Sequence, residues 1–115
     1  MNSTESDSQT AIAVPEAEVE TQRKRQPPYG VILHNDDLNT FEFVIETIRK
    51  VFGYDYEKCF KLTLEAHDQG RSLLWAGTLE GAELKREQVL SRGPDPVMKA
   101  RGALPLKVTL EELPQ

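Results

Sequence analysis

Residues 29–37 read YGVILHNDD, a short apolar run that three polar residues bring to an end. A β-prone apolar run of this length is typical of a buried strand, and Asn and Asp favour the turn that follows. We therefore predict a strand over residues 29–34 and a polar turn at Asn35, Asp36 and Asp37. The rest of the chain can be assigned from its own patterns on either side of this strand.

Two helices are predicted to follow the turn. Thr40 can act as an N-cap, because its side-chain oxygen can accept a hydrogen bond from a free backbone N–H group. Apolar residues then recur at helical spacing as far as Gly53. Asp55 is expected to cap a second helix, which has one apolar face and closes at Gln69-Gly70. The two apolar stripes are Phe41, Val44, Ile45, Ile48, Val51 and Phe52 in the first helix, and Cys59, Leu62, Thr63 and Ala66 in the second.

A second strand, a third helix and a last strand complete the predicted fold. Residues 72–76 form a short β-prone run, and Thr78 can cap a helix to about Arg92, where Gly-Pro-Asp-Pro at residues 93–96 forces a break. Residues 106–110 alternate between apolar and polar and predict the last strand. The order β-α-α-β-α-β predicts the α+β class: a small α/β sandwich with three helices over one face of a three-stranded antiparallel sheet. We expect this core domain to span residues 29–113.

The N-terminal segment has a different composition. Residues 1–28 are rich in Ser, Thr, Glu, Gln and Asp and contain no aromatic residue. Such a segment buries too little apolar surface to offset the entropy of ordering, roughly 1–2 kcal/mol per residue. We therefore predict a disordered tail. Its acidic residues fit neither a signal peptide nor a transit peptide.

The overall composition excludes several classes of protein. The net charge of −5 disfavours a nucleic-acid partner, which would require a basic surface. No run approaches the ~18 apolar residues of a membrane span. Cys59 is the single cysteine, so an internal disulfide is excluded and a reducing compartment is expected. These features predict a cytoplasmic protein that binds neither nucleic acid nor membrane. Nothing in the sequence indicates an obligate assembly, so we expect a monomer.

The sequence does not supply a complete set of catalytic groups. Cys59 and His67 lie eight residues apart on one predicted helix. That spacing is roughly 12 Å, too far for a nucleophile and its base. Neither a phosphate-binding glycine loop nor an HExxH helix is present. His34, Asp36 and Asp37 could be imagined with His67 as metal ligands, but acids at a strand end more often serve turns and caps. We therefore expect no enzyme, no metal and no cofactor.

What remains is a polar patch beside apolar positions. Asn35, Asp36 and Asp37 follow the first strand, and His67 ends a helix whose neighbouring positions are apolar or small. Taken singly, the first three would be a polar turn, and the histidine would be packed near a helix end with a hydrogen bond to backbone. Together they indicate a site that accepts hydrogen bonds and carries negative charge, next to a hydrophobic hollow.

Three motifs together resemble one protein family. They are VILHNDD at residues 31–37, TFEFV at residues 40–44 and AHDQGR at residues 66–71. On these motifs the chain, from about Pro28 to Glu112, resembles ClpS, the adaptor of the AAA+ Clp protease. The resemblance implies a non-catalytic adaptor that binds N-degrons, which are bulky hydrophobic N-terminal residues with a free α-amine, usually Phe, Tyr, Trp or Leu. It also implies that the adaptor delivers such substrate proteins to a Clp unfoldase.

The resemblance gives each site residue an expected role. Asn35 and a neutral His67 would accept hydrogen bonds from the α-ammonium group of the substrate. Asp36 would supply negative charge, and Asp37 would orient the loop. Beside them the family has a hydrophobic pocket for the first side chain of the substrate. The matching residues in this sequence are Ile32, Asn39, Phe41, Val44, Thr63, Ala66 and Leu106.

The chain departs from the family pattern at several positions. Phe41 stands where many members have Met, and Thr63 and Ala66 replace residues that are commonly larger and apolar. The connection over residues 92–104 is longer than usual, and Trp75 occupies a strand position that is often small. The altered pocket lining leaves a second function open, that of a regulator that docks on an AAA+ unfoldase without recognising N-degrons.

The implied partner is the N-terminal domain of a ClpA- or ClpC-like unfoldase. Glu80 and Lys85, on the third predicted helix, match the docking positions of the family. Without the resemblance, both would be taken as solvated residues of a helix face. A flexible tail of about 28 residues would have a mean reach of roughly 30 Å, which is compatible with engaging the unfoldase pore.

Overall fold

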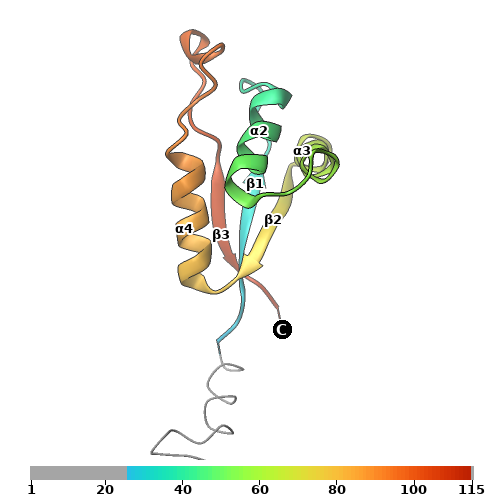
Figure 1. The fold of residues 1–115 in the computed structure, drawn as a ribbon, viewed down its shortest axis with the longest axis vertical. Coiled ribbons are helices and arrows are strands. Elements are labelled where there is room, and N and C mark those ends of the chain that lie inside the picture. The colour runs from blue at the N-terminus through green and yellow to red at the C-terminus, as the bar shows by residue number, and fades with distance from the viewer. Residues whose placement is uncertain (1–25, 115) are drawn as a thin grey trace, which may run out of the picture.

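The computed structural model of the chain describes residues 26–114, and within them three helices pack on a three-stranded sheet (Figure 1). The elements in chain order are β1 (Tyr29–His34), α2 (Phe41–Phe52), α3 (Tyr56–Gln69), β2 (Arg71–Gly77), α4 (Leu79–Leu90), the 3₁₀ helix η1 (Lys99–Arg101) and β3 (Val108–Glu112). The predicted order β-α-α-β-α-β and the α+β class are confirmed. Most of the predicted disordered tail, residues 1–25, lies outside the described residues.

β1 is the central strand of an antiparallel sheet whose order is β2-β1-β3. Tyr29 is paired with Gly77 of β2 on one side and with Glu112 of β3 on the other. The pairing with β2 shifts by one residue between Val31 and Ile32, so β2 carries a bulge there. Val31, Ile32 and Leu33 of this central strand are all buried, although successive side chains point to opposite faces, which suits the continuous apolar run of its sequence.

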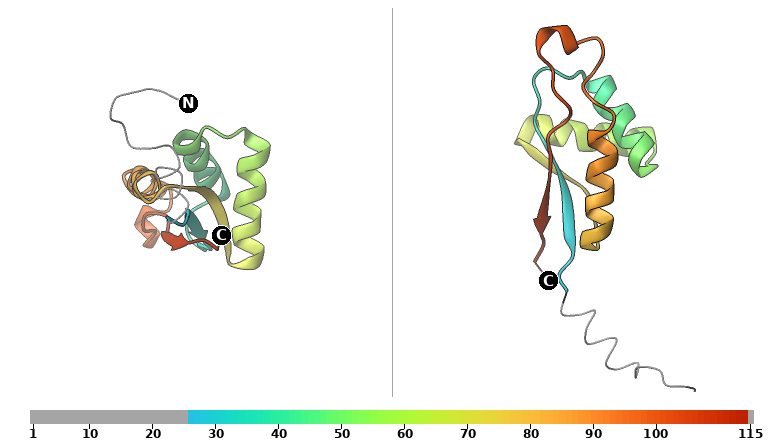
Figure 2. Two further views of the ribbon diagram at one scale, coloured as in Figure 1. Left: turned by 90° about the horizontal axis from the view of Figure 1, so that it is seen from below. Right: turned by 90° about the vertical axis from the view of Figure 1, so that its left-hand side faces the viewer.

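The helices lie on one face of the sheet (Figure 2). The core between the two layers contains fully buried side chains from every main helix and from β1. They include Val31 and Leu33 of β1, Ile48 of α2, Cys59 of α3 and Val89 of α4. Because α2, α3 and α4 each supply part of this core, the apolar stripes that predict the helices are also the surfaces that hold them on the sheet.

The predicted caps are present at all three helices. Oxygens of Thr40, Asp55 and Thr78 accept hydrogen bonds from backbone N–H groups in the first turns of α2, α3 and α4. Gly53 and Gly70 end α2 and α3 in the left-handed conformation, with φ of 77° and 94°. That conformation is costly for a residue with a Cβ atom, so these two glycines fix where the helices end.

Three elements differ in their bounds from the sequence-based expectation. β2 is longer by one residue at each end than residues 72–76, and α4 ends at Leu90 rather than near Arg92. The predicted last strand over residues 106–110 is wrong in its bounds, because β3 runs from Val108 to Glu112. The alternating pattern marks which residues are apolar, whereas the strand itself is set by its pairing with β1, which begins at Val108 opposite Leu33.

Trp75 fills a space that two glycines leave free. Its ring lies so close to Gly77 and Gly81 that a Cβ atom added to either would collide with it, at 2.7 Å in the case of Gly81. Trp75 is partly buried and packs against the core. The large residue at this strand position is therefore matched by small residues in β2 and in the first turn of α4.

Across residues 26–114, no helix combines the length and the apolar character that a membrane crossing requires.

Candidate functional site

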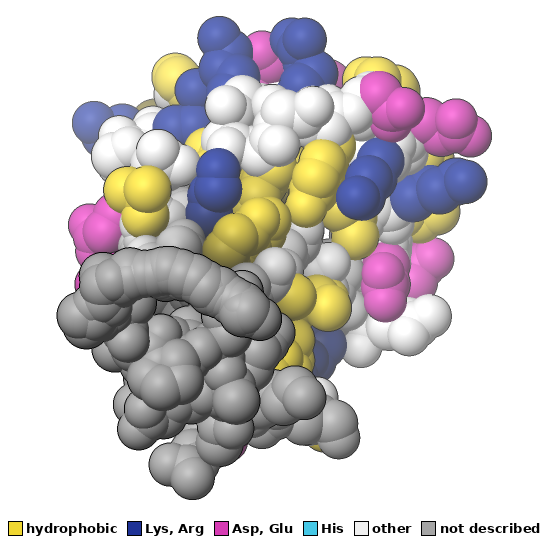
Figure 3. Space-filling view, turned by 60° about the horizontal axis from the view of Figure 1, so that its bottom comes forward, with side chains coloured by type: hydrophobic (Ala, Val, Ile, Leu, Met, Phe, Trp, Pro, Cys, Tyr) yellow, Lys and Arg dark blue, Asp and Glu magenta, His cyan; other side chains and the backbone are white. Residues whose placement is uncertain are grey.

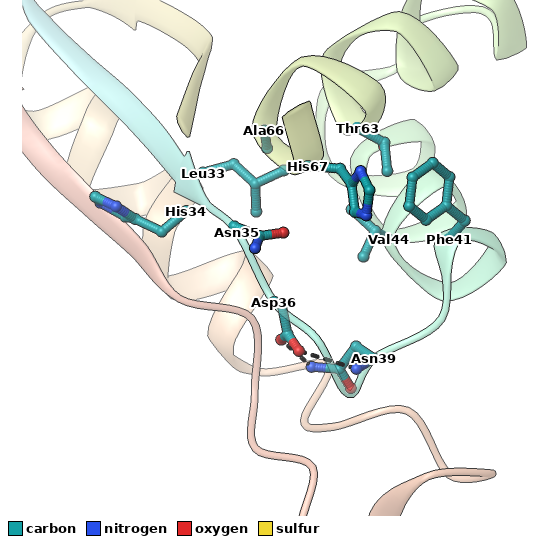
Figure 4. A pocket seen from close by; sticks show the side chains of 10 residues that line it. All are labelled: Leu33, His34, Asn35, Asp36, Asn39, Phe41, Val44, Thr63, Ala66 and His67. Carbon is teal, nitrogen blue, oxygen red and sulfur yellow. Dashed lines mark hydrogen bonds between the residues drawn. The ribbon is translucent and has the colours of Figure 1, made fainter. Parts of the chain in front are cut away.

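A small hollow opens where β1 ends, between the loop over residues 35–40, the start of α2 and the end of α3 (Figure 4). Its empty volume is about 280 Å³, including the open mouth. Ten residues line it: Leu33, His34, Asn35, Asp36, Asn39, Phe41, Val44, Thr63, Ala66 and His67. The hollow therefore combines a polar side, from the loop and His67, with an apolar wall from β1, α2 and α3.

The backbone brings the two polar segments together. The N–H of Asn35 donates to the carbonyl of Gly70 at 3.0 Å, which joins the end of β1 to the end of α3. Asn35 and His67 lie 32 positions apart in sequence, yet both line the same hollow. The polar turn and the helix-end histidine thus lie beside the same apolar surface.

Asp36 orders the loop that carries Asn35. Its Oδ1 accepts hydrogen bonds from the backbone N–H of Leu38 at 2.8 Å and of Asn39 at 2.9 Å. Its Oδ2 accepts a further bond from Nδ2 of Asn39. This is the loop-orienting role that the resemblance gave to Asp37. The charge of Asp36 remains at the hollow, but three of its four lone-pair positions are already used.

Asp37 instead orients the side chain of Asn35. Nδ2 of Asn35 donates to Oδ1 of Asp37 at 3.4 Å, a long and exposed contact. Because the amide nitrogen is directed to Asp37, the amide oxygen of Asn35 points into the hollow (Figure 4). Asn35 therefore presents an acceptor, which is what a donor-bearing ligand needs.

His67 also presents an acceptor. Its Nδ1 lies 3.1 Å from Oδ1 of Asp68, a carboxylate that can only accept. Nδ1 must therefore carry the proton in the neutral ring, and Nε2 keeps its lone pair. The ring stands edge-on to Phe41, with 5.4 Å between the ring centroids. This contact joins the polar side of the hollow to its apolar wall.

The apolar wall is built from Leu33, Phe41, Val44, Thr63 and Ala66. Thr63 contributes as an apolar residue, because its hydroxyl donates to the carbonyl of Cys59 at 2.8 Å and only the methyl group is left to contact a ligand. The ring of Phe41 meets that of Phe60 at 6.5 Å in an edge-on arrangement. The rim at the start of α2 is therefore a fixed aromatic side chain.

Two residues expected in the wall are not there. Ile32 and Leu106 are both buried, with 3% and 2% of their surface exposed, but neither lines the hollow. Side chains alternate along a strand, so Ile32 belongs to the opposite face of β1 and Leu33 takes the expected place. Leu106 is part of the core cluster below the wall. Val31, Ile32 and Leu33 are all apolar, so the sequence holds no signal that could have set this register.

His34 lines the hollow, but its ring is directed away from it (Figure 4). Nε2 of His34 lies 2.7 Å from Oγ1 of Thr109 in β3. Burial lowers the pKa of His34, and the positive charges of Lys107 and Arg71 lower it further. His34 is thus a structural residue of the sheet, and the metal site imagined from it has no support in its geometry.

A residue that sequence reasoning missed holds the loop from outside. Asp95, in the long connection before β3, is 4% exposed. Its Oδ2 accepts hydrogen bonds from the N–H of Thr40 at 3.2 Å and from the hydroxyl of Thr40 at 2.7 Å. Its own N–H donates to Oδ1 of Asn39 at 2.8 Å. These contacts, above all the bond from Thr40, hold the pKa of Asp95 below its usual value.

The expected docking residues have different surroundings. Glu80 is exposed in the first turn of α4 and borders a groove with Pro27, Pro28 and Leu79. Figure 3 faces this end of the molecule, where hydrophobic side chains gather among charged side chains of both signs. Lys85, in contrast, donates to the carbonyl of Val51 at 3.1 Å and so caps the end of α2. Of the two, Glu80 has the more accessible charge.

Within the described part of the chain, no group of three or more His, Cys, Asp or Glu residues is placed to hold a metal ion. Burial raises the pKa of the Cys59 thiol above its usual value. A thiol is a weak nucleophile until it loses its proton, so Cys59 is suited to packing rather than to covalent chemistry. The hollow can bind a ligand by shape, hydrogen bonds and charge.

The sequence matches one protein-family model, described as ATP-dependent Clp protease adaptor protein ClpS, over residues 24–109. Curated relatives agree with it. The chain is 41% identical over 90 residues to the ATP-dependent Clp protease adapter protein ClpS of Pectobacterium carotovorum subsp. carotovorum (strain PC1), covering 76% of this chain and 80% of the relative. It is 37% identical over 81 residues to the ClpS protein of Thermosynechococcus vestitus (strain NIES-2133 / IAM M-273 / BP-1), covering 70% and 86%.

A solved structure has the same fold. The structure of Agrobacterium tumefaciens ClpS2 bound to L-phenylalaninamide aligns with a TM-score of 0.66 and 28% sequence identity. The alignment covers 77% of this chain and all of that chain. The fold and the family that the three motifs indicated are therefore confirmed.

Proposed function

The chain belongs to the ClpS family, the adaptor proteins of the ATP-dependent Clp protease, and we propose that it binds the first residue of a substrate protein and delivers that protein to a Clp unfoldase. The observation that supports this proposal is the hollow itself. Two acceptors, Oδ1 of Asn35 and the free lone pair of the neutral His67 ring, lie at the polar side of a small apolar wall (Figure 4). The role requires no bond to be made or broken, so the protein acts as an adaptor and not as an enzyme.

The polar side of the hollow suits a free α-amino group. Such a group has a pKa near ~8, so at neutral pH it is mostly an ammonium with three donors. Asn35 and His67 accept two of these donors, and the carboxylate of Asp36 supplies the opposite charge. An N-acetylated terminus has lost its charge and two donors. Acceptors that the bound peptide shields from water and leaves unpaired cost on the order of 1–3 kcal/mol.

The apolar wall suits a bulky first side chain. Burial of a Leu or Phe side chain is worth roughly 1.5–3 kcal/mol, which discriminates against small or polar residues. The ligand in the similar structure, L-phenylalaninamide, carries both a free α-amine and a phenyl side chain. We therefore propose Phe, Tyr, Trp and Leu as the first residues that this hollow accepts.

Fluorescence anisotropy with labelled peptides tests the proposal. Peptides that begin with Leu, Phe, Tyr, Trp, Ala or Met are compared, each with a free and with an acetylated amine. We expect tight binding only for bulky first residues with a free amine. Equal binding of the acetylated peptides would overturn the proposal.

Delivery requires a second contact, with the N-terminal domain of a ClpA- or ClpC-like unfoldase in the cytoplasm. We propose Glu80 as its main charged contact, because Lys85 is already held by the end of α2. Glu80→Arg should abolish co-elution of the protein with the unfoldase domain and leave peptide affinity unchanged. Co-elution that survives this change would exclude the surface around Glu80. Co-elution without any peptide binding would favour the alternative, a regulator that docks without recognising N-degrons.

A further inference from the structure

We propose that Asp95 is a positioning residue for recognition of the substrate amine. Its carboxylate holds Thr40 and its backbone N–H holds Asn39, the partner of Asp36, so that the loop presents the acceptor of Asn35 to the hollow. This inference rests on the proposed function. It also gives a role to the long connection between α4 and β3, from which Asp95 projects.

Both the carboxylate and the backbone of Asp95 form hydrogen bonds. Its two carboxylate oxygens accept from Thr40 and from the N–H of Val97, the latter at 2.9 Å. Its backbone carbonyl accepts from the N–H of Met98 at 3.0 Å. A buried carboxylate is stable only when its lone pairs are satisfied, and here hydrogen bonds from two separate segments satisfy them. Asp95 thus joins a connection near the end of the chain to a loop that lies 55 and 56 positions earlier.

Asn39 transmits this contact to the recognition loop. Its Oδ1 accepts from the N–H of Asp95, while its Nδ2 donates both to Asp36 and to the carbonyl of Leu104 at 2.8 Å. A rotation of the amide by 180° would break all of these contacts, so its orientation is determined by both neighbours. Asp36, held in this way, accepts from the backbone of Leu38 and of Asn39 itself. The loop therefore has a second anchor in addition to the end of β1.

Thr40 extends the effect to the apolar wall. Its hydroxyl donates to Asp95 and accepts from the N–H of Phe43 at 3.2 Å, so the same contact fixes the start of α2. Phe41 and Val44, which line the hollow, lie in that first turn. A loop and helix start that are ordered before the ligand arrives do not have to be ordered on binding, which strengthens affinity.

The test compares peptide binding by Asp95→Ala and Asp95→Asn with the unaltered chain, well below the melting temperature of each. The probes are a Phe-initiated peptide, its analogue without the α-amino group, and an Ala-initiated peptide. We expect the Phe-initiated peptide to bind at least about tenfold more weakly to Asp95→Ala. The ratio of affinities with and without the amine should fall, while the ratio between Phe and Ala should change less.

Asp55→Ala is the matched control, because Asp55 caps α3 through the N–H of Lys58 at 2.9 Å, at the opposite end of that helix from His67. It should lower the melting temperature and leave the amine ratio unchanged. Thr40→Ala should also weaken binding, and the double variant with Asp95→Ala should cost less than the two single effects together, because the Thr40 hydroxyl and the Asp95 carboxylate share one hydrogen bond. An unchanged amine ratio in Asp95→Ala, or simple addition in this double variant, would overturn this inference. If the unaltered chain bound the Phe-initiated peptide and its analogue without the α-amino group equally well, the proposed function itself would be overturned.

Discussion

The imidazole of His67 has one nitrogen directed to Asp68 and one lone pair free. We expect His67→Ala to weaken binding of a Phe-initiated peptide at least about tenfold, or 1.4 kcal/mol. Its side chain is 54% exposed, so the melting temperature should hardly change. Anisotropy and thermal melts measure the two effects. Asp68→Ala removes only the partner of Nδ1 and should cost less affinity, and normal affinity in both variants would mean that the ring takes no part.

Asp36 combines a structural and an electrostatic role, and two substitutions separate them. Asp36→Asn keeps an oxygen for the N–H groups of Leu38 and Asn39, but it loses the charge and turns an NH₂ donor toward Nδ2 of Asn39. It should weaken binding of free-amine peptides and destabilise the fold less than Asp36→Ala does. Asp36→Ala loses both roles and should also destabilise the fold by about 0.5–2 kcal/mol, as the loss of a side-chain cap does. Urea melts and anisotropy test this, and equal effects of the two variants on binding and stability would contradict it.

Among the site residues, the sequence indicated those that stand within a local motif. Asn35 and His67 line one hollow, as expected, because a strand end and a helix end were both marked by local signals. Ile32 was predicted to line the hollow, but its neighbour Leu33 does so. A wholly apolar strand carries no alternation from which its register can be read. Asp95 could not be predicted, because its partners lie in another loop and no spacing rule connects them.

Gly81, in the first turns of α4, is a position where the usual substitution rule should reverse. Gly→Ala within a helix ordinarily stabilises by about 1 kcal/mol. Here the new methyl group would meet the ring of Trp75 at 2.7 Å and Oγ1 of Thr78 at 3.1 Å. We expect Gly81→Ala to destabilise the protein by about 1–3 kcal/mol in urea melts. In a Trp75→Leu background the same change should be neutral or stabilising, and a loss of equal size there would contradict this explanation.

Elements whose boundaries depend on neighbouring residues were predicted well, and those that depend on distant pairing were not. Thr40, Asp55 and Thr78 cap their helices within three residues, so local sequence fixes where these helices begin. The start of β3 is set by the partner strand, and it was predicted two residues too early. The fit of Trp75 against Gly81 joins β2 to α4, and it becomes visible only in the folded chain.

The stability of the whole domain should fall in two steps as the pH is lowered from 7. His34 has a pKa below its usual 6.5 in the folded state, because burial disfavours its charged form. The stability that depends on neutral His34 is present above pH 6.5 and is lost as the pH falls through the folded-state pKa. Asp95 has a pKa below its usual 3.8, so its contribution is present above that pH and is lost in a second, more acidic step.

Urea melts at a series of pH values measure both steps. His34→Gln, which can still bond to Thr109, should remove the step that begins near pH 6.5. Asp95→Asn should flatten the acidic step and lower the melting temperature at neutral pH, since the Thr40 contacts weaken. An unaltered pH profile in either variant would show that the corresponding group does not control stability.

The central position of β1 makes the mechanical resistance of the domain depend on the direction of a pull. Tyr29 and Glu112 are paired neighbours, so pulling Gln26 and Pro114 apart would peel β3 from β1 one pair at a time. A pull on Gln26 against a ligand anchored beyond His34 runs along β1 instead, and both ladders share the load in shear. Forced unfolding is governed by the rate of unfolding under load. When force is applied at Gln26 while a ligand is bound at the other end, the sheet is therefore loaded in shear, the direction in which it resists unfolding more strongly.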